Sequence, residues 1–169
     1  GGDRLKVTAQ KFGLGEKVLG EYFENEKKGL FPNTSWKKNN LGKGWVLGET
    51  LITGIGQGYV QTTPLQLCIM TAQTANGGYS IKPKIIVNNN PLNFAEAKKS
   101  MEEQNFFNSN NQLFKDERNI KIIQEAMFSS TNEIMGTSYG SRIDDPKYQF
   151  AGKTGTAQVK RISKREREL

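Results

Sequence analysis

The stretch "QFAGKTGTAQVKR", Gln149 to Arg161, places a lysine between a glycine and a threonine and then repeats Gly-Thr. One interpretation is a nucleotide-binding loop, in which glycines and a lysine surround a phosphate. That pattern requires an earlier glycine at the position that holds Lys147, and Pro146 and Tyr148 flank this lysine. No strong strand precedes the stretch either. The nucleotide-binding interpretation is therefore excluded.

The same stretch is typical of an extended strand whose polar edge faces a ligand. The side chains of Lys153 and Thr154 extend outward from such a strand, and Gly155 leaves room for the backbone of a ligand to approach. We expect a strand over residues 152–159 that pairs with the rest of a sheet. A tripeptide of common residues is most often an ordinary exposed strand, so the remainder of the chain has to support a site.

The composition limits the chemistry that the chain can perform. A length of 169 residues suits one domain or part of a larger one, and the net charge is +7. Histidine is absent, which excludes Ser-His-Asp and Cys-His catalysis and histidine-based metal sites and leaves lysine as the natural base. The basic C-terminal run has no interleaved aromatic residues, so we expect no nucleic-acid binding. No apolar run has the length of a membrane span, and any anchor or export signal is expected outside this chain.

The clearest local signal is a helix start at "TPLQ". Thr63 stands at the N-cap, Pro64 at the first helical position, and Gln66 where a capping box needs it. The helix continues through "LQLCIMTAQTA", apolar on most sides, and we expect it to be buried and about three to four turns long. An Asn-Gly-Gly sequence ends it. Cys68, the single cysteine, is expected in the core and not as a nucleophile.

Other segments have weaker patterns. We expect Trp36 and Trp45 to cover the core from lysine-rich loops. For the remaining segments we expect a helix over residues 3–12, a turn-rich surface segment over 13–44 and a sharp bend or close backbone approach at 54–58. We also expect a strand over 79–87, a mobile loop or insertion over 91–111 and an amphipathic helix from about residue 112.

Three segments together resemble the transpeptidase domain of class B penicillin-binding proteins. These are "WVLGETLITGIGQGYVQTTPLQLCIMTAQTANGG", the helix ending near "AMFSSTNEIMGT", and "YQFAGKTGTAQV". Lys-Thr-Gly is one of the motifs of penicillin-binding proteins and class A β-lactamases. The upstream "FGLGEKVLGEYFENEKKGLFPN" is most similar to the elongation-type branch, penicillin-binding protein 2.

The resemblance implies an α+β fold, an antiparallel sheet with helices on both faces, and a serine D,D-transpeptidase that cross-links peptidoglycan and is a penicillin target. The implied substrate is the D-Ala-D-Ala end of a stem peptide, with no cofactor and no metal. It also implies a cell-elongation glycosyltransferase as partner and a location on the periplasmic side of the inner membrane. Two alternatives stay open: a hydrolase of the D,D-carboxypeptidase or β-lactamase type, and a non-catalytic penicillin-binding-like module.

The family also carries Ser-x-x-Lys and Ser-x-Asn motifs, and the chain contains a match to each. Ser35 to Lys38 fits the first, but it lies among asparagines, lysines and a proline and is expected in a solvated loop, where a lysine does not become neutral. Ser130 to Asn132 fits the second, but it is expected at a helix end. We therefore expect the nucleophile outside this chain, so that residues 1–169 are part of a transpeptidase domain without its upstream motifs and last strands.

The resemblance assigns roles only to the Lys-Thr-Gly motif, because the matches to the other two motifs are rejected. Lys153 resembles the lysine that keeps the cleft positive, and Thr154, Gly155 and Thr156 resemble the substrate-binding strand. The backbone N–H of Thr156 resembles one of the oxyanion-hole donors. We expect the isolated chain to be inactive and, because sheet edges would be uncovered, to self-associate.

Overall fold

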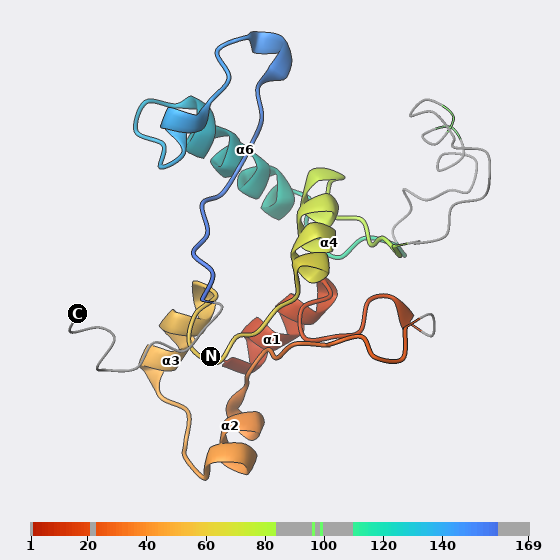
Figure 1. Ribbon diagram of the computed structural model, residues 1–169, viewed down its shortest axis with the longest axis vertical. Helices are drawn as coiled ribbons and strands as arrows, with labels where there is room; N and C mark the ends of the chain where they lie inside the picture. The colour runs from red at the N-terminus through yellow and green to blue at the C-terminus, as the bar shows by residue number, and fades with distance from the viewer. Residues whose placement is uncertain (1, 21–22, 84–95, 97–98, 100–109, 159–169) are drawn as a thin grey trace. The chain divides into compact units, whose positions relative to one another are not determined.

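A computed structural model describes residues 2–20, 23–83, 96, 99 and 110–158 of the chain (Figure 1). The chain divides into two compact units, Gly1–Ile120 and Lys121–Leu169, which are described separately here. The helices within the described ranges are α1 (Gly2–Lys11), α2 (Thr34–Leu41), α3 (Leu47–Gly54), α4 (Pro64–Ala75) and α6 (Arg118–Asn132), and two 3₁₀ turns follow, η2 (Tyr139–Ser141) and η3 (Pro146–Tyr148).

Helix α4 begins and ends where its sequence predicts. The Thr63 hydroxyl accepts the Gln66 N–H at 3.2 Å, the Gln66 amide oxygen accepts the Thr63 N–H at 3.0 Å, and Pro64 is the first helical residue. At the other end Gly77 and Gly78 have φ angles of 91° and 87°, which favour glycine. The predicted capping box and helix stop are confirmed.

The expectation that α4 is buried on most sides is wrong for the described chain. Ile69 is buried and Met70 half-buried, but Leu67 and Cys68 are exposed, so Cys68 is not a core residue here. The physical reason is that a helix buries only the faces on which other elements pack. In the described residues α4 has partners along the side that carries Gln66, Ile69 and Gln73.

The buried side chain of Gln66 holds the loop that follows α1 against the start of α4. Its Nε2 donates to the carbonyl oxygens of Glu16 at 2.7 Å and Lys28 at 2.9 Å. Next to it, Leu30 and Gln61 form an antiparallel bridge with a pair of 2.8 Å hydrogen bonds. In the described residues 13–20 and 23–30 the segment after α1 is therefore a loop held by hydrogen bonds to Gln61 and Gln66.

The second half of that segment contains a helix that the sequence patterns did not reveal. Asn33 caps α2, its side chain accepting the Trp36 N–H at 2.9 Å, and Gly42 ends the helix with a φ of 65°. Helix α3 was missed as well, because glycines dominate its surroundings. The bend after it is confirmed, with positive φ angles at Gly56 and Gly58.

An ion pair joins α2 to α3. The ammonium of Lys37 contacts the Glu49 carboxylate and donates to the Gly44 carbonyl at 2.7 Å. The Glu49 carboxylate also accepts the Val46 N–H at 2.9 Å. The hydrogen bond from Lys37, and then that from Val46, hold the pKa of the Glu49 carboxyl below its ordinary value.

Aromatic contacts complete the first unit. Phe12, which follows α1, lies 5.4 Å from Phe114 between ring centroids, and Trp36 lies 5.3 Å from Tyr59. Trp45 contacts Gly2 of α1 so closely that a Cβ there would be 2.8 Å from the indole. Both tryptophans are half-buried, as predicted, although Trp36 is on a helix and not in a loop.

The expected strand over 79–87 is reduced to one bridge in the part that the structure describes. Tyr79 pairs with Gln112, and Ser80 N–H donates to the Asn111 carbonyl at 2.8 Å. Residues 84–87 lie outside the described residues. So does the expected mobile loop over 91–111, apart from residues 96, 99, 110 and 111.

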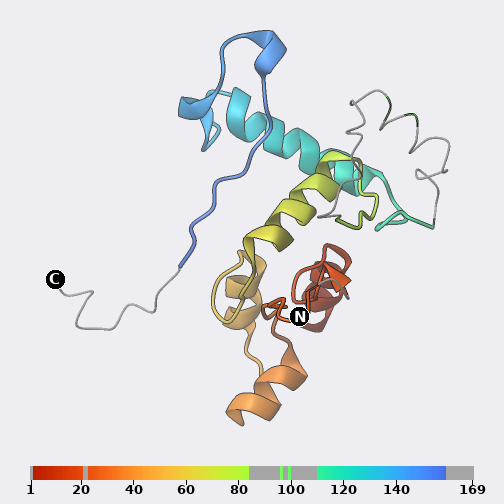
Figure 2. The same ribbon diagram turned by 45° about the vertical axis from the view of Figure 1, so that its right-hand side comes forward.

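In the second unit the chain turns back after α6. Ser138 N–H donates to the Ser130 carbonyl at 2.9 Å, and a Cβ on Gly136 would lie 2.2 Å from the same carbonyl oxygen, so only glycine fits there. Beyond η3 the chain crosses α6 and continues as an extended segment, which Figure 2 shows in blue. Among the described residues, no helix has the length and apolar character needed to span a membrane.

Candidate functional site

The segment from Lys153 to Thr156 is extended and exposed, and it carries no strand assignment in the described range that ends at residue 158. The predicted strand over 152–159 is therefore wrong for residues 152–158, and Val159 lies outside the described residues. The physical reason is that a strand is defined by a regular ladder of hydrogen bonds to a neighbouring strand, and extended backbone angles alone do not make one.

The tip of Lys153 lies beside the next residue. Its Nζ donates to the Thr154 carbonyl oxygen at 2.9 Å and to the Thr154 hydroxyl oxygen at 3.2 Å. Successive side chains of a regular strand point to opposite faces, so this contact also reflects the irregular backbone. Because the hydroxyl oxygen accepts from the ammonium, its own hydrogen is directed elsewhere. The pair presents a positive charge and a hydroxyl donor together, which suits a carboxylate.

Helix α6 anchors the chain immediately before this pair. Gly152 N–H donates to the Met127 carbonyl at 3.0 Å. Asn132, the last residue of α6, donates through Nδ2 to the carbonyl of Phe150 at 2.9 Å. These contacts determine where the extended segment leaves the helix. Sequence reasoning missed the role of Asn132, because a contact across 18 positions has no local signature.

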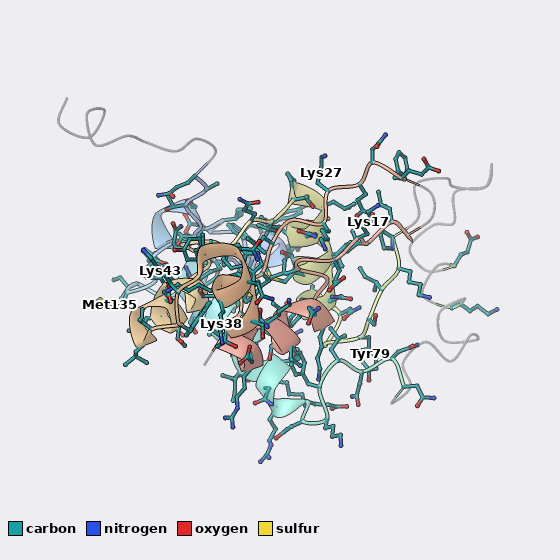
Figure 3. All side chains as sticks on the ribbon, turned by 90° about the horizontal axis from the view of Figure 1, so that it is seen from below. Lys17, Lys27, Lys38, Lys43, Tyr79 and Met135 are labelled. Carbon is teal, nitrogen blue, oxygen red and sulfur yellow. The ribbon has the colours of Figure 1, made fainter. Side chains whose placement is uncertain are left out.

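The Ser35 to Lys38 match lies on α2, so the expectation of a solvated loop is wrong. Ser35 is in the first turn, which is the place where a Ser-x-x-Lys motif belongs. However, Ser35 and Lys38 are both exposed; Lys38 is among the side chains labelled in Figure 3. The buried lysine of this helix is Lys37, which is paired with Glu49. Because Ser35 and Lys38 are both in contact with water, the match lacks the shielded environment that a catalytic base needs.

The Ser130 to Asn132 match lies in the last turn of α6, and its prediction as a helix end is confirmed. The Ser130 hydroxyl lies 3.2 Å from the Thr137 hydroxyl, and Thr131 is fully buried. The structure thus brings Asn132 next to the Lys-Thr-Gly segment by way of Phe150, whereas the Ser130 hydroxyl contacts Thr137. No cluster of metal-ligating side chains occurs among the residues that the structure describes.

The chain belongs to the penicillin binding protein transpeptidase domain family, whose profile matches residues 1–168. Within that family its similarity is to the penicillin-binding protein 2 branch. It is 35% identical over 165 residues to peptidoglycan D,D-transpeptidase MrdA of Acinetobacter baumannii, covering 98% of this chain and 23% of the relative. It is 30% identical over 171 residues to the MrdA protein of Haemophilus influenzae, covering 98% of this chain and 24% of the relative.

Solved structures agree with this assignment. Penicillin-binding protein 2 of Pseudomonas aeruginosa, in complex with WCK 5153, matches with a TM-score of 0.69 and 34% identity over 94% of this chain and 34% of that one. The same protein of Helicobacter pylori, in complex with MreC, matches with a TM-score of 0.69 and 32% identity over 94% of this chain and 26% of that one. The expected fold class is confirmed, although the described residues show helices and isolated bridges only. The chain spans about a quarter of the length of the curated relatives it matches.

Proposed function

We propose that this chain is the part of a peptidoglycan D,D-transpeptidase that binds the terminal carboxylate of a D-Ala-D-Ala stem peptide. In the whole protein a serine outside this chain attacks the penultimate D-Ala carbonyl, D-Ala leaves, and an amine of a second stem peptide resolves the acyl-enzyme. β-Lactams acylate the same serine.

One observation carries the proposal. The ammonium of Lys153 lies 3.2 Å from the Thr154 hydroxyl, both groups are exposed, and they belong to the Lys-Thr-Gly motif of a family-matched chain. A carboxylate that docks there accepts from the ammonium and from the hydroxyl. Charge-assisted hydrogen bonds of this kind are stronger than neutral ones.

The backbone N–H of Thr156 is proposed as one of the donors to the oxyanion that forms during acylation. Negative charge appears on the carbonyl oxygen only in the transition state, so a donor held in place beforehand lowers the barrier. Apart from its chain neighbours, none of the described residues has a heavy atom within 4 Å of the place where a Cβ of Gly155 would stand, so this position leaves room for a ligand.

The location and partners are proposed by analogy with the relatives. MrdA relatives are peptidoglycan transpeptidases, so the active site is expected on the periplasmic side of the inner membrane, with an anchor supplied outside this chain. A protein of the MreC type is a candidate partner, because the Helicobacter pylori relative was solved in complex with MreC. A cell-elongation glycosyltransferase is the second candidate partner.

The experiment uses the whole protein and a fluorescent penicillin. The wild-type protein is expected to label covalently on a serine, and Lys153→Ala is expected to label about a hundredfold more slowly. Lys147→Ala, an exposed lysine of η3, is the matched control and is expected to label at the wild-type rate. Equal rates for the two variants would overturn the role of Lys153, and no labelling of the wild type would favour a non-catalytic module. Release of the acyl group to water and not to an amine would favour a hydrolase.

A further inference from the structure

The last turn of α6 contacts the chain that leads into the Lys-Thr-Gly segment through the side chain of Asn132. Its Nδ2 donates to the carbonyl of Phe128, one turn back in the same helix, and to the carbonyl of Phe150, both at 2.9 Å. One amide group therefore joins the helix end to a backbone atom three residues before Lys153. Phe150 comes two residues after Tyr148, the last residue of η3.

Packing around this contact is close. Thr131 is fully buried, and a Cβ on Gly152 would lie 3.2 Å from its hydroxyl oxygen. Together with the hydrogen bond from Gly152 N–H to Met127, this fixes the chain on both sides of Ala151. Lys153 is the residue that directly follows this anchored stretch. The position of Lys153 therefore depends on the anchor at the helix end.

We propose that Asn132 is a positioning residue for carboxylate binding, acting through the backbone of Phe150 on Lys153 and Thr154. The inference rests on the proposed function. Asn132 itself does not touch the substrate. Without its amide, the Phe150 carbonyl loses a donor, and the extended chain is free to shift along the helix end. A displacement of about 1 Å at a binding group can reduce a rate by up to about a hundredfold.

The test compares Asn132→Leu with Asn40→Leu in the whole protein. Leucine keeps the size of asparagine and removes the donor. Asn40 is a matched control, because its Nδ2 makes the same one-turn-back bond, to the Trp36 carbonyl at 2.8 Å, in α2. We expect Asn132→Leu to lower the second-order rate of penicillin labelling by about tenfold or more. Asn40→Leu is expected to keep the wild-type rate.

Saturation kinetics separate positioning from a general loss of structure. A positioning role raises the half-saturating penicillin concentration while the whole protein population still labels. Damage to the fold lowers the labelled fraction and leaves the rate of the remaining molecules unchanged. Asn132→Asp provides a second variant, since its carboxylate keeps the shape but repels the two carbonyl oxygens. It is expected to be impaired as much as Asn132→Leu, at a melting temperature that falls by no more than that of the control.

A double-mutant cycle with Lys153→Ala shows whether Asn132 acts through Lys153. We expect the double variant to label only slightly more slowly than Lys153→Ala alone. Effects that multiply would overturn the proposal, as would an Asn132→Leu rate equal to that of Asn40→Leu while Lys153→Ala is slow. If Lys153→Ala itself labels at the wild-type rate, the proposed function fails, and the role of Asn132 fails with it.

Discussion

Lys37 on α2 and Glu49 on α3 form an ion pair whose side chains are shielded from solvent, with 7% and 16% of their surface exposed. The ammonium has a second partner in the Gly44 carbonyl. Removing one member of a shielded pair leaves the other charge without compensation, which destabilises a protein more than the loss of an exposed pair does.

This pair predicts a pH-dependent stability. The pKa of Glu49 is lowered from 4.5 in the folded protein, so the pair stabilises fully above that value and loses its effect as the pH falls through the lowered pKa. Glu49→Gln should therefore lower the melting temperature of the whole protein at neutral pH, and the difference from wild type should shrink in acid. Thermal denaturation as a function of pH measures both.

The control for this prediction is Arg118→Gln. It removes the Arg118–Asp116 pair, in which 85% and 42% of the side-chain surfaces are exposed. An exposed pair contributes little to stability, so this variant should melt close to the wild type. A Glu49→Gln variant that melts like Arg118→Gln at every pH would contradict the role given to the shielded pair.

Gln66→Leu should destabilise the first unit by about 1–3 kcal/mol, because the carbonyl groups of Glu16 and Lys28 lose their donor and the Thr63 N–H loses its acceptor. The substitution keeps the volume and the helical backbone. Gln112→Leu is the matched control, since the Gln112 amide donates to Glu117 at an exposed site. Urea denaturation of the two variants measures the difference, and equal midpoints would show that Gln66 does not hold the loop.

Gly29→Ala should be more damaging than Gly20→Ala. Both glycines have positive φ angles, 62° and 64°, so the backbone penalty for alanine is shared. A Cβ at Gly29 would lie 2.3 Å from the Gln61 carbonyl oxygen, whereas none of the described atoms lies within 4 Å at Gly20. The extra loss of stability in Gly29→Ala therefore reports the close approach alone. Equal melting temperatures would mean that the Leu30–Gln61 bridge can shift to make room for the Cβ without a loss of stability.

Residues 1–169 alone should form no covalent adduct with a penicillin. Ser35 stands in the first turn of a helix, but it and Lys38 are exposed, so the lysine one turn away is not shielded from water as a catalytic base needs to be. Intact-mass measurement after incubation should show the unmodified chain, with the whole protein labelled in parallel. An added ligand mass that disappears in Ser35→Ala would identify Ser35 as a nucleophile and contradict the interpretation.

The sequence by itself determined features that depend on neighbours a few residues away. Thr63, Pro64 and Gln66 specify the start of α4, because capping hydrogen bonds span a single turn. The Lys-Thr-Gly motif and the other matching segments identify the family for the same reason, because each is a short continuous sequence motif.

Only the tertiary structure decided the rest. It turned residues 34–41 into a helix, left Leu67 and Cys68 exposed, and joined Asn132 to Phe150 across the chain. Burial and long-range hydrogen bonds depend on which elements pack together, and strands depend on partners supplied by other segments. The extended form of Lys153 to Thr156 is therefore compatible with its sequence, whereas the point at which this segment leaves α6 follows from contacts that no local pattern encodes.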